Sequence, residues 1–96
     1  MNYEDFKKDF KGFTIPNNVL RDKDLTLREK VFVGLIMEAS ENGKCTLSNR
    51  EIADFFKLSI GRTSYVVNSL KNKGYIKVSF NRDGKQILNR IIEVTL

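Results

Sequence analysis

Histidine and tryptophan are absent from this 96-residue chain, and cysteine and proline each occur once. Without histidine there is no imidazole base, no Ser-His-Asp triad and no Cys₂His₂ zinc site. The single cysteine, Cys45, cannot form an intramolecular disulfide, and we expect it to be a small buried or half-buried thiol. These absences exclude most enzyme chemistry. We therefore predict a protein that is not an enzyme and that has no catalytic residue, no metal and no cofactor.

Long apolar runs are also lacking. None approaches the roughly 20 residues of a transmembrane helix, and residues 1–5 show no signal-peptide pattern. We therefore expect a soluble, cytoplasmic protein. Apolar residues make up 41% of the chain and charged residues 30%, with seven Phe and three Tyr for a core. This length and composition predict one folded domain.

The basic residues are concentrated in the second half. The net charge is +5, but residues 1–43 hold seven Lys/Arg and eight Asp/Glu, whereas residues 44–96 hold ten and four. Because the basic residues are spread over several predicted elements, a nucleic acid is a better partner for them than a membrane surface. A merely solvated basic surface explains the charge equally well, so the charge alone decides nothing.

The first 12 residues read as a short amphipathic helix or arm. Tyr3, Phe6 and Phe10 recur at helical spacing, and Gly12 ends the pattern. This apolar stripe either folds back onto the domain or reaches a partner chain. Beyond it, the pattern predicts a short strand or extended lead at residues 13–15, then a break at the proline and the start of a helical turn at 17–20.

A longer helix begins at Thr26, which forms a capping box with Glu29, and closes near Gly43. Intervals of three and four place six apolar residues on one face of this helix. They are Leu27, Val31, Phe32, Leu35, Ile36 and Ala39. An extended link over residues 45–47 follows.

Two short helices come next. Ser48 and Glu51 form a second capping box for a helix that ends at Lys57, and Ser59 is the N-cap of another helix that ends at Gly74. The buried face of this last helix is predicted to comprise Thr63, Val66, Val67 and Leu70. Its opposite face carries residues that can hydrogen-bond or make small apolar contacts with base edges: Ile60, Gly61, Arg62, Ser64, Tyr65 and Asn68.

Beyond Gly74 the period changes from helical to alternating, and Asp83-Gly84 signals a two-residue hairpin turn. In simple two-residue register the predicted pairs are Phe80 with Ile87, Val78 with Asn89 and Ile76 with Ile91. Further along, Ile92, Val94 and Leu96 fall on the opposite parity. Either a bulge shifts the strand or its second face is covered, for example by the N-terminal segment.

A family resemblance is carried by SNREIADFFKLS at residues 48–59, KGYI at 73–76, and Thr63, Val67 and Leu70. These residues resemble bacterial winged helix-turn-helix DNA-binding domains. FTIPN at 13–17 and LTLREK at 25–30 make the chain most similar to the N-terminal domain of plasmid and phage replication initiator proteins, a likeness that covers about residues 13–91. It implies an α+β fold over residues 13–96, in which about three to four helices precede a β-hairpin wing.

The resemblance implies double-stranded DNA as the partner. The helix at about residues 59–73 would enter the major groove, and the basic wing at 75–92 would meet phosphates or the minor groove. Arg62 would pair with guanine, and Tyr65 would reach a phosphate or a thymine methyl unless it packs on the wing or a neighbouring helix. The candidate DNA-binding residues are Arg50, Ser59, Arg62, Ser64, Tyr65, Asn68, Lys71, Arg82 and Lys85.

Several alternatives stay open at this point. The biological role is either replication initiation or transcription regulation. A homodimer is plausible because one recognition helix covers few base pairs, with the N-terminal helix and the last strand as candidate interfaces. The rival function is a protein-interaction module, favoured if the N-terminal helix and Ile92, Val94 and Leu96 form a large apolar patch.

Overall fold

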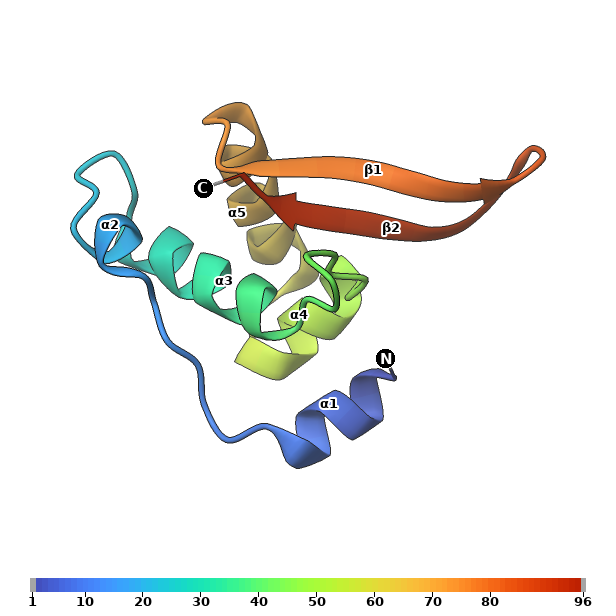
Figure 1. Cartoon of the computed structure of the whole chain (residues 1–96), viewed down its shortest axis with the longest axis horizontal. Coiled ribbons are helices and arrows are strands. Elements are labelled where there is room, and N and C mark those ends of the chain that lie inside the picture. Colours follow the sequence, from blue (N-terminus) through green and yellow to red (C-terminus); the bar gives the residue numbers. More distant parts are fainter. Residues whose placement is uncertain (1, 96) are drawn as a thin grey trace.

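Helices precede strands in this chain. The computed structural model describes residues 2–95, over which a helical body carries a projecting C-terminal hairpin (Figure 1). The elements are α1 (Tyr3–Asp9), α2 (Asn17–Leu20), α3 (Leu27–Glu38), α4 (Asn49–Phe56), α5 (Ile60–Asn72), β1 (Ile76–Asp83) and β2 (Gln86–Val94). The predicted α+β class is confirmed: α1 lies within residues 1–12, and four helices precede the hairpin over residues 13–95, within the three to four expected there.

Side-chain caps determine where the main helices begin. At α3 the Thr26 hydroxyl accepts the Glu29 N–H at 3.1 Å, and the Glu29 carboxylate accepts the Thr26 N–H at 2.8 Å. Ser48 and Glu51 form the same reciprocal pair at α4. The Ser59 hydroxyl caps α5. Each of these caps was predicted, and each satisfies backbone donors that a helix start leaves unpaired.

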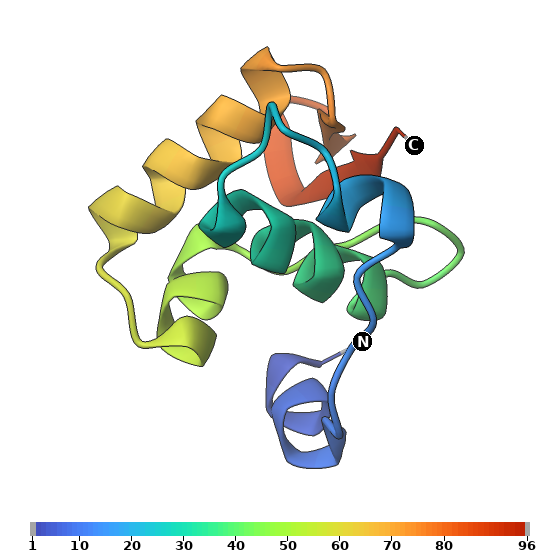
Figure 2. The ribbon, with the colours of Figure 1, turned by 90° about the vertical axis from the view of Figure 1, so that its left-hand side faces the viewer.

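The core lies where α3 meets α4, α5 and the base of the hairpin, and α3 is buried on more than one side. Val33, Leu35 and Ile36 are all fully buried. The predicted single apolar face is therefore partly wrong: Val33 belongs to the core, whereas Leu27 is 72% exposed. α2 and the preceding extended segment cover a second side of α3, so α3 buries side chains beyond the predicted face (Figure 2).

That second side depends on a glycine. A β-carbon built on Gly34 of α3 would lie 2.4 Å from the Phe13 ring and 3.1 Å from Ile15. The segment around residues 13–15 therefore passes directly over α3. It is extended but forms no strand, in agreement with the predicted extended lead.

The N-terminal helix folds back onto the domain. Its Phe10 ring packs edge-on against Phe55 of α4 at a centroid distance of 4.8 Å, and buried Phe6 lies 5.7 Å from the same ring. The Tyr3 hydroxyl donates a 2.6 Å hydrogen bond to the Asp54 carboxylate. Of the two predicted arrangements for α1, packing on its own domain is the one observed.

The hairpin turn lies one residue later than predicted. Asp83 opposes Gln86, so the two turn residues are Gly84 and Lys85. Gly84 has a φ of 61°, a left-handed conformation that glycine adopts without steric cost.

The register of the hairpin also differs from the prediction. A bulge falls between Asn81 and Arg82, and it leaves Leu88 without an opposing residue. The observed pairs are Ile76 with Val94, Val78 with Ile92 and Phe80 with Arg90, in place of the predicted partners Ile91, Asn89 and Ile87. The bulge and the later turn together explain the change of parity along β2, so of the two predicted explanations the bulge is confirmed.

The second face of β2 is not covered by the N-terminal segment. Cys45, in the link after α3, pairs with the edge of β2 that faces away from β1 and exchanges two backbone hydrogen bonds with Ile92, at 2.9 and 2.8 Å. Cys45 is buried, as predicted, and burial raises the pKa of its thiol. Leu96 lies outside the described residues.

Candidate nucleic-acid interface

The outward side of α5 is a polar stripe. Thr63, Val66, Val67 and Leu70 are buried as predicted, so the side that faces away from the body follows the spacing of four, three and four residues. Those positions are Gly61, Tyr65, Asn68 and Asn72, all of them exposed. Asn72 was missed from sequence, although the same spacing would have found it.

Three candidate side chains on α5 are unengaged. Within residues 2–95 the side chains of Arg62, Tyr65 and Asn68 form no hydrogen bond or ion pair, and Tyr65 is 76% exposed. At this exposure Tyr65 is not packed on the wing or on a neighbouring helix, which was the predicted alternative. Because α5 contains no Asp or Glu, nothing on this helix repels a polyanion.

The two serine candidates are engaged within the protein. Ser59 accepts the Arg62 N–H at 3.1 Å as the helix cap. Ser64 is half-buried, and its hydroxyl accepts a 3.1 Å hydrogen bond from the Asn49 amide at the start of α4. The prediction placed Ser64 on the outward face, but it lies on the flank of α5 that contacts α4.

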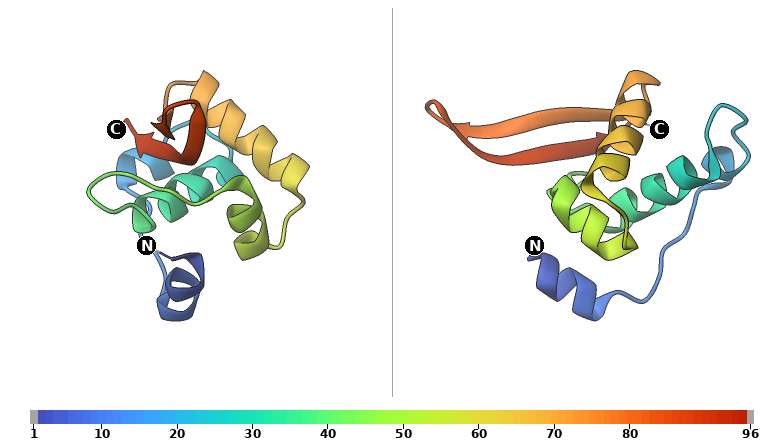
Figure 3. Two further views of the ribbon diagram at one scale, coloured as in Figure 1. Left: turned by 90° about the vertical axis from the view of Figure 1, so that its right-hand side faces the viewer. Right: turned by 180° about the vertical axis from the view of Figure 1, so that it is seen from behind.

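The wing carries its charge far from the body. All residues from 80 to 88 are exposed, and the hairpin extends well past the helices (Figure 3). Lys85 stands in the turn itself, while Arg82 lies in β1 with its guanidinium carbon 5.8 Å from the centre of the Phe80 ring. Asp83 is the one carboxylate near this tip.

An arginine that sequence reasoning missed joins the wing to the helices. Arg90 of β2 donates from Nη1 to Asn49 Oδ1 at 2.6 Å and from Nη2 to the Leu47 carbonyl at 2.7 Å. Since Asn49 also donates to Ser64, one chain of hydrogen bonds runs from β2 through α4 to α5. Burial lowers the pKa of Arg90, yet an arginine side chain stays charged at neutral pH.

The contacts of Arg90 were missed because the predicted register of the hairpin was wrong. In the predicted pairing, Ile87, Asn89 and Ile91 share the inner face, which points Arg90 outward. In the observed pairing Arg90 shares the face of Ile92, and its long side chain reaches inward. An arginine at an inner position of a strand would have indicated a polar link to the helices.

Comparison with known families decides the type of fold. Residues 41–77, which span α4, α5 and the start of β1, match the model of a family described as winged helix-turn-helix DNA-binding. The fold is that of a winged helix-turn-helix. The match supports binding of double-stranded DNA by the chain. No curated protein and no solved structure matches it.

In this winged helix-turn-helix, a buried carboxylate fixes the C-terminal half of α5 to α3. Glu29 is 3% exposed and accepts hydrogen bonds from the Thr26 N–H, from Ser69 at 2.6 Å and from Lys73 at 2.9 Å. Desolvation opposes its ionisation, but the hydrogen bonds from Ser69, Thr26 and Lys73 outweigh it and lower the pKa of Glu29 to about 2. Sequence reasoning identified only the capping role of this residue.

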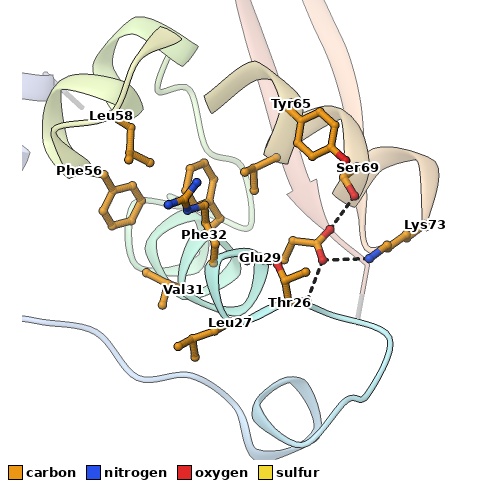
Figure 4. A pocket seen from close by; sticks show the side chains of 12 residues that line it. Thr26, Leu27, Glu29, Val31, Phe32, Phe56, Leu58, Tyr65, Ser69 and Lys73 are labelled. Carbon is orange, nitrogen blue, oxygen red and sulfur yellow. Dashed lines mark hydrogen bonds and ion pairs between the residues drawn. The ribbon is translucent and has the colours of Figure 1, made fainter. Parts of the chain in front are cut away.

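A groove of about 860 Å³ lies between α3, the end of α4 and α5 (Figure 4). Leu27 lines it, which explains why this residue is not in the core. Tyr65 stands at the α5 side, and the Glu29 cluster closes one end. The other lining side chains are mainly apolar: Val31, Phe32, Phe56, Leu58 and Val66.

The two remaining candidates are single exposed cations. Arg50 lies in the first turn of α4, and Lys71 lies in the last turn of α5. Among residues 2–95, neither side chain has a protein partner.

No group of three metal-ligating side chains comes together in the part of the chain that the structure describes. The described helices are all too short or too polar to span a bilayer.

Proposed function

We propose that this winged helix-turn-helix recognises double-stranded DNA by placing α5 in the major groove and its wing against the neighbouring backbone. The observation that carries the proposal is the outward stripe of α5. Tyr65, Asn68 and Asn72 are exposed side by side on a helix that has no acidic residue. A helix of this kind fits the major groove, whose base edges offer both hydrogen-bond partners and methyl groups.

Base readout falls to four residues in this proposal. Arg62, on the flank of the stripe, pairs with the O6 and N7 atoms of a guanine. Asn68 and Asn72 offer amides to an adenine or to a phosphate. Tyr65 lays its ring on a thymine methyl or donates its hydroxyl to the backbone.

Backbone contacts come from the other candidates. Arg50, Lys71, Arg82 and Lys85 are exposed cations that neutralise phosphates. Ser59 and Ser64, whose hydroxyls are already acceptors in the protein, still have an O–H to donate to DNA or to fix the start of α5. With about five phosphates neutralised, the slope of log K against log salt is about −4 to −5.

Replication initiation is the biological role we favour over transcription regulation, on the resemblance of residues 13–91 to plasmid and phage initiators. Either role requires a domain that binds a specific site on a duplex. We further propose that two copies bind paired half-sites, because α5 alone covers only a few base pairs. Phe6 of the N-terminal helix and Ile92 of β2 are buried within the domain, so neither side chain is available to such an interface. With Phe6 and Ile92 buried, we favour DNA binding over a protein-interaction module.

A selection from a random duplex library tests this function. Enrichment of one short motif, with lost discrimination at one of its positions in Arg62→Ala, supports recognition through α5. If no motif is enriched and a single strand competes as well as a duplex, the proposal fails and the protein-interaction module becomes the better account.

A further inference from the structure

The outer half of the wing displays apolar side chains that the core does not use. Phe80, Ile87 and Leu88 are 49%, 50% and 56% exposed. At the base of the same hairpin Ile76 and Ile92 are buried, so it is the base that packs into the core. A solvent-facing tip has no folding need for three large apolar residues, and their exposure within one short stretch of hairpin is typical of a contact surface.

Leu88 is the residue of β2 that the bulge leaves without a partner on β1. Asn81 opposes Asn89 and Arg82 opposes Ile87, so Leu88 is the extra residue between them. A bulge bends its strand and redirects the side chain at that point. The most exposed apolar residue of the tip is thus also the one whose backbone lies outside the regular pairing.

The surroundings of this apolar tip are cationic. Arg82 and Lys85 flank it, and Asp83 is the single opposing charge. Apolar side chains ringed by positive charge are complementary to stacked bases between two rows of phosphates. The tip also belongs to the proposed DNA interface, because it carries Arg82 and Lys85, to which phosphate contacts are assigned above.

We propose that the wing inserts Leu88 into the minor groove as a wedge and thereby bends the duplex, an inference that rests on the proposed DNA binding. Two strands lie about 4.8 Å apart before their side chains are counted, and the minor groove of B-DNA is only about 6 Å wide. The wing therefore enters only if the groove opens. An apolar side chain driven against a base step unstacks it partly, opens the minor groove and bends DNA toward the major groove.

Bending is measured by energy transfer between dyes on the two ends of a duplex of about 30 base pairs, at protein concentrations that saturate each variant. The wild-type protein raises the transfer, and Leu88→Ser lowers it to near the level of free DNA. Lys85→Ala is the matched control: it weakens binding and flattens the salt dependence but keeps the bend at saturation. Leu88→Met, which remains apolar, also keeps the bend.

Two results overturn the wedge while leaving DNA binding intact. One is tight binding by the wild-type protein without bending, and the other is an equal bend with Leu88→Ser. Sedimentation of the free protein adds a third: a dimer that becomes a monomer in Leu88→Ser assigns the tip to a second copy of the chain. Absence of any duplex binding by the wild type instead refutes the proposed function itself.

Discussion

Arg90 Nη1 donates a 2.6 Å hydrogen bond to Asn49 Oδ1, and this contact joins the wing to the first helix of the helix-turn-helix. The second guanidinium nitrogen holds the Leu47 carbonyl at 2.7 Å. Asn49 in turn donates to Ser64 on α5. The angle between the wing and α5 is therefore fixed by a partly buried polar chain as well as by apolar packing.

Arg90→Met keeps the aliphatic stem but removes both hydrogen bonds. We expect a loss of about 1.5–3 kcal/mol in the free energy of unfolding, because a charged donor is lost and its acceptors are left unpaired. Urea denaturation followed by circular dichroism measures it. The wing also loses its fixed angle, so Lys85→Ala should cost less DNA affinity in the Arg90→Met background than in the wild type. Equal costs in the two backgrounds would show that Arg90 does not position the wing.

Gly61→Ala should change folding stability and duplex binding in opposite directions. No atom lies within 4 Å of a β-carbon built at this exposed helical position, so the methyl group clashes with nothing in the protein. Alanine should raise the free energy of unfolding by about 0.5–1 kcal/mol. Because Gly61 lies on the outward stripe, the same methyl should weaken duplex binding severalfold.

Gly34→Ala is the contrasting variant, since its β-carbon would lie 2.4 Å from the Phe13 ring and must destabilise the fold. Thermal melts and duplex titrations on both variants give the comparison. A Gly61→Ala protein that is more stable and binds as tightly as the wild type contradicts the close approach of α5 to DNA.

Arg62→Ala and Lys85→Ala should weaken binding in different ways. Loss of Arg62 should cost about 1–3 kcal/mol on the preferred site and relax the preference at one base pair. Loss of Lys85 should weaken all duplexes alike and reduce the salt slope by about 1. Titrations of each variant with several duplexes at several salt concentrations distinguish the two patterns. Equal losses on every sequence from both variants would refute the assigned roles.

Glu29 should make stability depend on acid pH. Its pKa is lowered from 4.5 to about 2 in the folded protein, so the ionised form is favoured by folding. The resulting stability, on the order of 3 kcal/mol, is fully present above about pH 4.5 and is lost as the pH falls toward 2. Urea denaturation between these pH values measures the loss.

Glu29→Gln should be less stable at neutral pH and should lose the part of the acid dependence that comes from this residue. Ser69→Ala removes one hydrogen bond to the carboxylate and should show a smaller change in the same direction. If the stability of Glu29→Gln depended on pH in the same way as that of the wild type, this carboxylate would not be the cause of the acid dependence.

Local signals in the sequence were sufficient for the helices. Thr26, Ser48 and Ser59 each predicted a helix start that the structure confirms, because a cap is a contact between residues three apart. The buried side of α5 followed from its spacing for the same reason. The polar stripe opposite it followed largely as well, except that Asn72 was missed and Ser64 lies closer to α4.

Features that depend on distant contacts could not be predicted in this way. Val33 belongs to the core and Leu27 lines the groove between α3 and α5, and both placements depend on tertiary packing that no helical period encodes. The register of the hairpin changed through a bulge and a later turn, and with it the direction of Arg90. The Glu29 and Lys73 pair joins residues that are 44 apart in sequence.

The salt dependence of duplex binding tests the central claim most directly. A labelled duplex of about 25 base pairs is titrated by fluorescence anisotropy at about 50 and 200 mM salt, with an unlabelled single strand as competitor. We expect micromolar binding that falls more than a hundredfold between these salts and resists the single strand. No binding at the lower salt would mean that the exposed stripe of α5 and the basic wing do not form a DNA interface.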